Sequence, residues 1–346
     1  MEQNFNLLLE RVLDTLNKSD LLAIKQQLEN IKGNTILVGA GGSSVVSTFA
    51  SKVLNIPNVR SARDLNYMNL KNIDNIVVFS YSGNGYVIES LLDNNKKIYL
   101  FTNGDKTYDN VEIIKYDSTI KNEHSFISLA STLIPMSILY HYYNSLRLPQ
   151  FESYLMDMFD KAKYINIHSN MIYEILTGYD SMTASKFLET TMVESGIAIP
   201  VIHDKYDYCH GRSTLSYKSN NGLILFNSEK ELDELLFYNL KEYYTEIVKI
   251  NRYYPNDCII GNDFYATICS MYLTKKLAEN KGMDLSKVDY SPIVKKLYKY
   301  KGEMYYAKYK ICYRQLWKIY LCKRKVWKIW NRNKICKYRY WWTRYK

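Results

Sequence analysis

Hydrophobic positions along the chain follow two alternating patterns. Apolar residues at helical spacing predict two amphipathic helices over residues 5–31. From residue 34 onward, short apolar runs alternate with helical stretches. The runs predict buried parallel strands at Ile36–Val38, Ile76–Phe79 and Ile98–Phe101, and a weaker edge strand at Val111–Ile114. The stretches between and after them predict helices at 43–55, 85–94 and 123–146.

The same alternation begins again in the second half of the chain. Residues 147–170 contain Pro149, have little strand character, and are predicted to be linker and helix. Beyond them we predict strands at Ile172–Leu176, Leu223–Phe226, Glu246–Ile250 and Cys258–Ile260, with helices at 180–196, 229–243 and 263–280. This repeat predicts an α/β fold with two consecutive doubly wound parallel-sheet domains of the flavodoxin-like kind. The expected divisions are N-terminal helices 1–33, domains 34–150 and 151–304, and a tail 305–346.

Composition narrows the class of protein. A chain of 346 residues suits two ordinary domains, and no run of 18 apolar residues or signal-peptide pattern occurs. We therefore expect a cytoplasmic protein that does not enter membranes. The six cysteines form no C-x-x-C pair, and no His, Asp and Glu cluster has metal-ligand spacing. We expect neither metal nor cofactor.

The net charge of +11 comes from the tail. Residues 305–346 hold nine Lys, five Arg and all five Trp but no acidic residue, whereas residues 1–304 hold 32 basic and 35 acidic residues. The tail has three interpretations: a frameshifted terminus, a basic segment without a specific role, or a segment that binds nucleic acid or an acidic membrane. Because the body is mildly acidic, nucleic acid is not an expected partner of the folded domains.

Two polar turns follow predicted strands in the first domain. Gly39-Ala-Gly41-Gly-Ser43-Ser44 opens a helix, where glycines allow a tight turn and free backbone N–H groups favour an anion. Ser80-Tyr81-Ser82-Gly-Asn84-Gly85 places two hydroxyls after the next core strand. Each turn alone could be structural. Since open α/β sheets bind ligands at the carboxyl ends of strands, the two could converge on one phosphate.

These turns resemble the sugar isomerase (SIS) domain family, which has G-x-G-[ST]-S after its first strand and S-x-S-G-x-[ST] after a later one. The resemblance implies that a sugar phosphate is bound by residues of both turns: Gly41, Ser43, Ser44, Ser80, Tyr81, Ser82, Asn84 and Gly85. At Gly85 the family usually has a hydroxyl, so the chain departs from the pattern there.

A third constellation lies in the second domain. Glu194 ends an apolar helix, and His210-Gly211 follows sixteen residues later in a polar segment. A carboxylate and an imidazole suit aldose–ketose interconversion, in which one group opens the sugar ring and the other moves a proton between C1 and C2. Both residues could instead be structural. His203 and Arg212 flank the segment and could contact the sugar or a second anion.

The spacing is similar to that in the isomerase half of glucosamine-6-phosphate synthase, a two-SIS-domain protein. Its catalytic Glu, an acidic residue and a His-Gly pair match Glu194, Asp207 and His210, and the likeness continues to Gly282, Asp284 and Lys287. The chain has Thr191 where the synthase has a lysine, and Ile293 where it has its Schiff-base lysine. No glutaminase domain precedes the SIS domains, so we do not expect synthesis of glucosamine 6-phosphate from glutamine.

The resemblance implies an enzyme of amino sugar or related metabolism. The candidates are an aldose–ketose isomerase or a deaminase or deglycase of an amino (fructosamine) sugar phosphate, with Glu194 and His210 as catalytic residues and Asp207 at the substrate. In related SIS proteins the histidine segment comes from a neighbouring subunit, which implies a homodimer. The alternative is a non-catalytic regulator that binds a phosphosugar.

Overall fold

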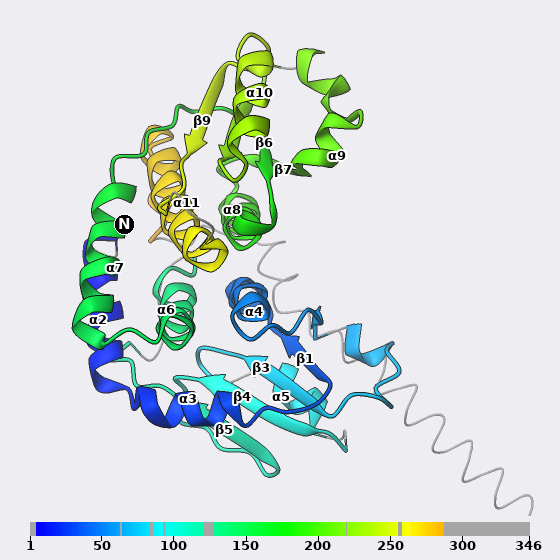
Figure 1. Cartoon of the computed structure of the whole chain (residues 1–346), viewed down its shortest axis with the longest axis vertical. Helices are drawn as coiled ribbons and strands as arrows, with labels where there is room; N and C mark the ends of the chain where they lie inside the picture. The colour runs from blue at the N-terminus through cyan, green and yellow to red at the C-terminus, as the bar shows by residue number, and fades with distance from the viewer. Residues whose placement is uncertain are drawn as a thin grey trace, which may run out of the picture. The chain divides into compact units, whose positions relative to one another are not determined.

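Two parallel β-sheets form the framework of the chain (Figure 1). The computed structural model describes residues 5–62, 64–83, 86–92, 95–120, 123, 127–218, 220–254 and 258–286. The first sheet has the order β2-β1-β3-β4-β5 and comprises β1 (Thr35–Val38), β2 (Val59–Arg60), β3 (Asn75–Phe79), β4 (Lys97–Thr102) and β5 (Val111–Lys115). The second has the order β7-β6-β8-β9 and comprises β6 (Ile172–Thr177), β7 (Ile199–Asp204), β8 (Gly222–Phe226) and β9 (Glu246–Ile250). The predicted pair of doubly wound parallel sheets is thus confirmed.

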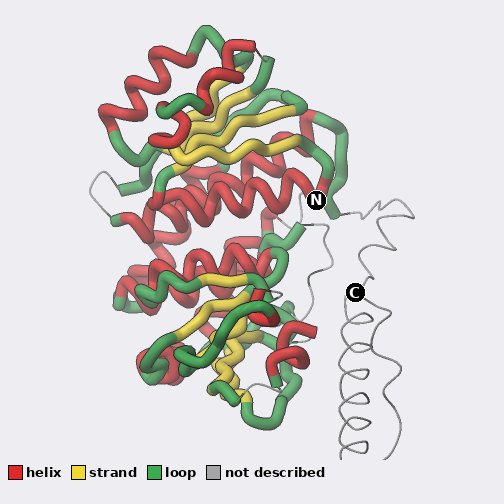
Figure 2. Tube along the Cα trace, turned by 90° about the vertical axis from the view of Figure 1, so that its right-hand side faces the viewer, coloured by secondary structure: helices red, strands yellow, loops and turns green. Residues whose placement is uncertain are grey.

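Helices pack between the two sheets in two layers (Figure 2). Those next to the first sheet are α4 (Gly42–Val53) and α6 (Ala130–Asn144), and those next to the second are α8 (Met182–Ser195) and α11 (Ile259–Asn280). Their apolar side chains form one continuous core with the inner faces of both sheets. Because helices cover both faces of the central strands, β1, β3 and β8 are buried along their whole length.

The outer faces of the sheets carry shorter helices. Against the first sheet lies α5 (Tyr86–Leu91), and against the second lie α9 (Lys205–Cys209) and α10 (Lys230–Leu240). The predicted N-terminal helices are α2 (Leu8–Lys18) and α3 (Leu21–Glu29), and the linker forms α7 (Leu148–Ala162). Three 3-10 turns complete the described elements: η1 (Asp64–Asn66), η2 (Tyr179–Ser181) and η3 (Arg212–Lys218).

A buried ion pair ties the two helical layers together. Lys52 of α4 pairs with Asp263 of α11, and both side chains are almost fully buried. Asp263 also accepts a hydrogen bond from the backbone N–H of Thr183, at the start of α8, at 3.1 Å. Because a buried charge without a partner is strongly destabilising, this contact fixes how α4 lies against α8 and α11.

Three sequence predictions are wrong in detail. Residues Cys258–Ile260 were expected to form a strand, but Cys258 is the N-cap of α11 and the helix begins at Ile259. The long helix expected from residue 123 begins at Ala130. Strand β7 was not expected, because Pro200 and an alternation of exposed and half-buried residues mask it; proline is tolerated there because β7 is an edge strand. The tail 305–346 lies outside the described residues.

Candidate active site

The two polar turns of the first half lie side by side at one edge of the first sheet. Val38, the last residue of β1, pairs in register with Val78 of the neighbouring β3. The turns beginning at Gly39 and Ser80 therefore leave adjacent strands, which lie about 5 Å apart in a sheet. This is the edge at which open α/β sheets bind ligands.

The N-terminus of α4 is left open by the glycine-rich turn. Gly41 is the N-cap with φ +55°, a conformation that favours glycine, and no side chain caps the helix. The hydroxyl of Ser44 donates to the Gly41 carbonyl at 2.7 Å, so it supports the turn. Ser43 is half-buried, and its hydroxyl bonds to no described residue. An uncapped twelve-residue helix with a nearby hydroxyl suits an anion.

The neighbouring helix α6 is capped by the protein itself. The Glu123 carboxylate accepts from the backbone N–H groups of Ala130 and Ser131, each at 2.9 Å. Near the N-terminal end of α6, the first residue of α4 packs closely against this helix. A Cβ on Gly42 would lie 2.8 Å from Thr132 Oγ1, a fully buried oxygen without a hydrogen-bond partner among the described residues. The end of α4, and not that of α6, is thus open to a ligand.

In the second turn the serine side chains and the tyrosine side chain differ in burial. Ser80 and Ser82 are half-buried, whereas the Tyr81 ring is buried and its hydroxyl donates to the Ile120 carbonyl at 2.6 Å. Burial raises the pKa of Tyr81 to about 12. Its side chain is therefore committed to the core, and only its backbone remains for a ligand. Asn84 and Gly85 lie outside the described residues.

Glu194 lies at the same end of the helical layers as the glycine-rich turn. Lys186 Nζ of α8 donates to Thr48 Oγ1 of α4 at 3.3 Å, while the contact through Asp263 joins Lys52 to Thr183. Residue numbers therefore rise along α4, from Thr48 to Lys52, while those of the neighbouring α8 residues fall, from Lys186 to Thr183. The two helices are antiparallel. The C-terminal end of α8, with Glu194, therefore adjoins the N-terminal end of α4.

The Glu194 carboxyl is chemically suited to proton transfer. The residue is exposed, yet desolvation by the surrounding protein raises the pKa of its carboxyl. A raised pKa keeps both the acid and the carboxylate accessible closer to neutral pH. Lys186, two helical turns earlier, was missed by the sequence reasoning; its half-buried position lowers the pKa of its ammonium group. Its spacing of eight residues from Glu194 was the available signal.

Asp207 lies on the short helix α9, and His210 is the C-cap of this helix. Both are exposed, and the His210 N–H ends the helix by donating to the Tyr206 carbonyl at 3.1 Å. Asp207 Oδ2 lies 3.6 Å from Arg212 Nη2 at the surface. His203 instead belongs to β7, where its Nε2 lies 3.7 Å from Glu174 Oε2. The predicted polar segment is therefore partly helical, and it presents Asp207 and His210 to solvent.

The second sheet separates His210 from Glu194 of the same chain. Helix α8 packs on the inner face of this sheet, where Leu188 and Met192 join the main core. Helix α9 packs on the outer face, where Tyr208 joins Leu223 and Leu225. In addition, β7 runs between the end of α8 and the start of α9, and six strand residues span roughly 15–20 Å. Within one chain, Glu194 therefore lies near the end of α8 that faces the start of α4, whereas His210 lies beyond the second sheet.

The described part of the chain contains no group of three or more His, Cys, Asp or Glu residues that could hold a metal ion. None of its helices is long and apolar enough to cross a membrane.

Comparisons with known proteins identify the fold. No protein-family model and no curated protein matches the sequence. Among solved structures, the C-terminal domain of glucosamine-fructose-6-phosphate aminotransferase from Francisella tularensis is 14% identical, with a TM-score of 0.58 over 82% of this chain and 97% of that one. Glucosamine-6-phosphate deaminase from Thermotoga maritima is 16% identical, with a TM-score of 0.60 over 81% and 96%.

A third similar structure is tagatose-6-phosphate ketose/aldose isomerase from Escherichia coli. It is 12% identical, with a TM-score of 0.63 over 84% of this chain and 96% of that one. Identities this low establish a common fold and not a common activity. The chain thus has the fold of the two-SIS-domain phosphosugar isomerases, as the two polar turns predicted.

Proposed function

We propose that the chain is an enzyme that processes a phosphosugar, either as an aldose–ketose isomerase or as a deaminase or deglycase of an amino sugar phosphate. The observation that supports the proposal is the uncapped N-terminus of α4 beside two hydroxyl-bearing turns, together with a carboxyl of raised pKa at the end of the antiparallel helix α8. The three similar structures are those of an aminotransferase, a deaminase and an isomerase named for sugar 6-phosphates, which supports the same substrate class. Because sugar phosphates are small soluble metabolites, we place the proposed reaction in the cytoplasm.

The phosphate is assigned to the first half of the chain. Its oxygens would accept hydrogen bonds from the hydroxyls of Ser43, Ser80 and Ser82 and from backbone N–H groups at the start of α4 and in the second turn. Of the other residues predicted in the second turn, Tyr81 would contribute only its main chain, and Asn84 and Gly85 lie outside the described residues. The positive end of the α4 dipole adds to this binding. Gly41 and Ser44 shape the turn. No lysine or arginine is needed for an anion held in this way.

Proton transfer is assigned to Glu194. Its carboxylate takes the proton from C2 of the open-chain aldose, which leaves an enediolate, and a second proton moves from O2 to O1. The resulting acid returns its proton to C1, and the ketose forms without loss of any atom. For this cycle the group must act first as base and then as acid, which a carboxyl of raised pKa does well near neutral pH.

Ring opening is assigned to His210 of a second copy of the chain. Within one chain the second sheet keeps His210 and Glu194 apart. Since His210 and Asp207 are exposed on a surface helix, a homodimer can bring them to the partner's Glu194. In a symmetric dimer each copy would supply one histidine and receive another.

The second candidate function is a phosphosugar sensor without catalysis. The observation that favours it is that the two polar turns lie entirely within one chain, so binding needs no residue from a partner. Exchange of the C2 proton tests the two candidates. With a panel of ketose, aldose and amino sugar phosphates in deuterated solvent, the enzyme incorporates deuterium at C2 of an aldose or at C1 of a ketose, whereas a sensor binds the sugar and incorporates none.

A further inference from the structure

The helix that would carry His210 is held on the second sheet by two buried side chains. Helix α9 has five residues, too few to be stable in isolation. Lys205 and Tyr208 lie on its inner side, each only 1% exposed, whereas Tyr206, Asp207 and Cys209 are exposed. The orientation of His210 therefore depends on what Lys205 and Tyr208 contact.

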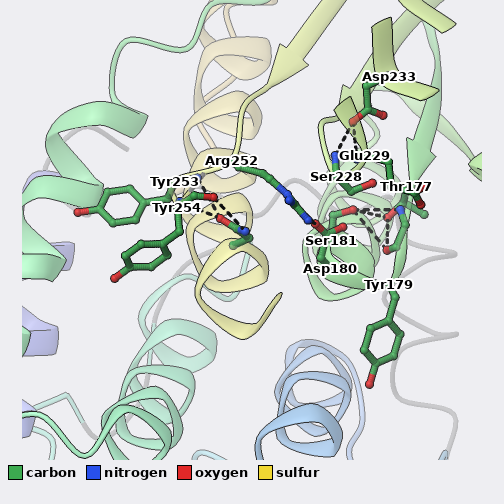
Figure 3. A network of polar contacts seen from close by, with 12 residues as sticks. Thr177, Tyr179, Asp180, Ser181, Ser228, Glu229, Asp233, Arg252, Tyr253 and Tyr254 are labelled. Carbon is green, nitrogen blue, oxygen red and sulfur yellow. Dashed lines mark hydrogen bonds and ion pairs between the residues drawn. The ribbon is translucent and has the colours of Figure 1, made fainter. Parts of the chain in front are cut away.

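Lys205 reaches the carboxyl-end edge of the second sheet. Its ammonium donates to Ser228 Oγ at 2.5 Å and pairs with the buried carboxylate of Asp233. The other Asp233 oxygen accepts from the backbone N–H groups of Ser228 at 2.6 Å and Glu229 at 2.8 Å (Figure 3). Asp233 thus connects α9 to the turn between β8 and α10.

This edge of the second sheet corresponds to the candidate phosphate site of the first half. By order in their sheets, β8 takes the place of β3, and the turn after β8 takes that of Ser80–Gly83. In the second half the N–H groups of that turn are already satisfied by Asp233, and Lys205 neutralises the carboxylate. An internal ion pair therefore fills the place where an anionic ligand would bind.

Tyr208 provides the second anchor through a buried polar network. Its hydroxyl lies 2.7 Å from the hydroxyl of Tyr244, which in turn donates to Glu174 Oε2 at 2.7 Å. Glu174 lies on β6, near the middle of the sheet, and also accepts from Ser216 at 3.1 Å. Lys205 and Tyr208 thus connect α9 to the end of β8, to the start of β9 and to β6.

We propose that Lys205 and Asp233 are positioning residues for His210. In this chain the carboxyl-end edge of the second sheet has the task of fixing α9, so that a rigid Asp207–His210 surface is ready for a second copy before the subunits meet. Preorganisation of this kind reduces the entropy lost on association. The inference deepens the proposed function, on which the role of His210 rests.

Hydrogen exchange of the full chain tests the anchoring without any turnover. Asp233→Asn keeps the side-chain volume and removes the charge facing Lys205. We expect the amides of residues 206–211 to exchange at least tenfold faster, with little change in α8 and α11. Unchanged exchange in 206–211, or an equal rise throughout the chain, would overturn the proposal. If Asp233→Asn does not fold, Ser228→Ala removes one acceptor of Lys205 and gives the same readout.

Asp263→Asn is the matched control. It removes a carboxylate from the other buried lysine–aspartate pair, Lys52–Asp263, which makes no contact with α9 in the described part of the chain. We expect faster exchange in α4, α8 and α11 and no selective change in residues 206–211. Selective loosening of 206–211 in this variant would also overturn the assignment.

Kinetics separates positioning from stability. Asp233→Asn should slow the reaction of a ring-forming sugar phosphate at least tenfold more than that of an analogue that cannot cyclise. An unchanged ratio despite faster exchange in α9 would overturn the positioning role. A wild-type chain without any turnover would overturn the proposed function instead, and the exchange experiment would still decide whether Asp233 anchors α9.

Discussion

Glu194 and His210 lie on opposite faces of the second sheet, although only sixteen residues separate them in the sequence. Glu194 ends α8 beside the start of α4, whereas His210 follows α9 on the outer surface. A catalytic pair of these two residues therefore requires two chains. The proposed catalytic pair thus depends on the proposed dimer.

The serine hydroxyls should contribute separately to phosphosugar affinity. We expect Ser43→Ala, Ser80→Ala and Ser82→Ala each to weaken binding by about 1–2 kcal/mol, as for a hydrogen bond to a charged group. Isothermal titration calorimetry with sugar phosphates measures this. Ser51→Ala is the control, because Ser51 lies farther along α4 and its hydroxyl donates to the Thr48 carbonyl. Full affinity in all three variants would place the ligand elsewhere.

Glu194→Gln should abolish proton transfer while sparing binding. The amide keeps the size of the side chain and removes the base, so we expect turnover to fall by roughly 100-fold or more with little change in affinity. Glu189→Gln, an exposed substitution on the same helix, should be silent. Steady-state rates and titrations on the same preparations give both quantities. Equal activity of the two variants would exclude Glu194 as the base.

The pH profile should report the environment of Glu194. Desolvation raises the pKa of this carboxyl, and only the carboxylate can accept the C2 proton. The rate should therefore fall as the pH drops through a value above the ordinary range of a glutamate, about 4.3. We expect this acidic limb in kcat measured on saturating substrate. A limb at an unperturbed carboxyl pKa would contradict the assignment of Glu194.

The sequence predicts the part of the site in the first half of the chain better than the part in the second half. The turns after β1 and β3 were predictable, because a short polar motif after a buried strand has a fixed place in a parallel sheet. Strand β7 was not, since Pro200 interrupts its apolar pattern. Nor could the sequence show that Tyr81 turns into the core, or that Lys205 meets Asp233 across 28 residues, because both depend on tertiary contacts.

Deleting residues 305–346 should leave the fold intact. That segment has no glycine and no strand-like alternation with which to join a parallel sheet. Thermal unfolding of the shortened chain should match that of the full chain, and any nucleic-acid binding that is lost should be sensitive to salt. A large drop in Tm would show that the tail packs against the domains and contradict its interpretation as a frameshifted terminus.

Mixing two inactive variants tests the central claim most directly. Glu194→Gln and His210→Ala chains, each inactive alone on a ring-forming sugar phosphate, are unfolded together, refolded and assayed. If each site takes Glu194 from one chain and His210 from the other, one site of every mixed dimer is intact, and random pairing restores about a quarter of the wild-type activity. Recovery to that level is the result we predict. Mixed dimers formed in the expected proportion but without activity would contradict a site shared between two chains.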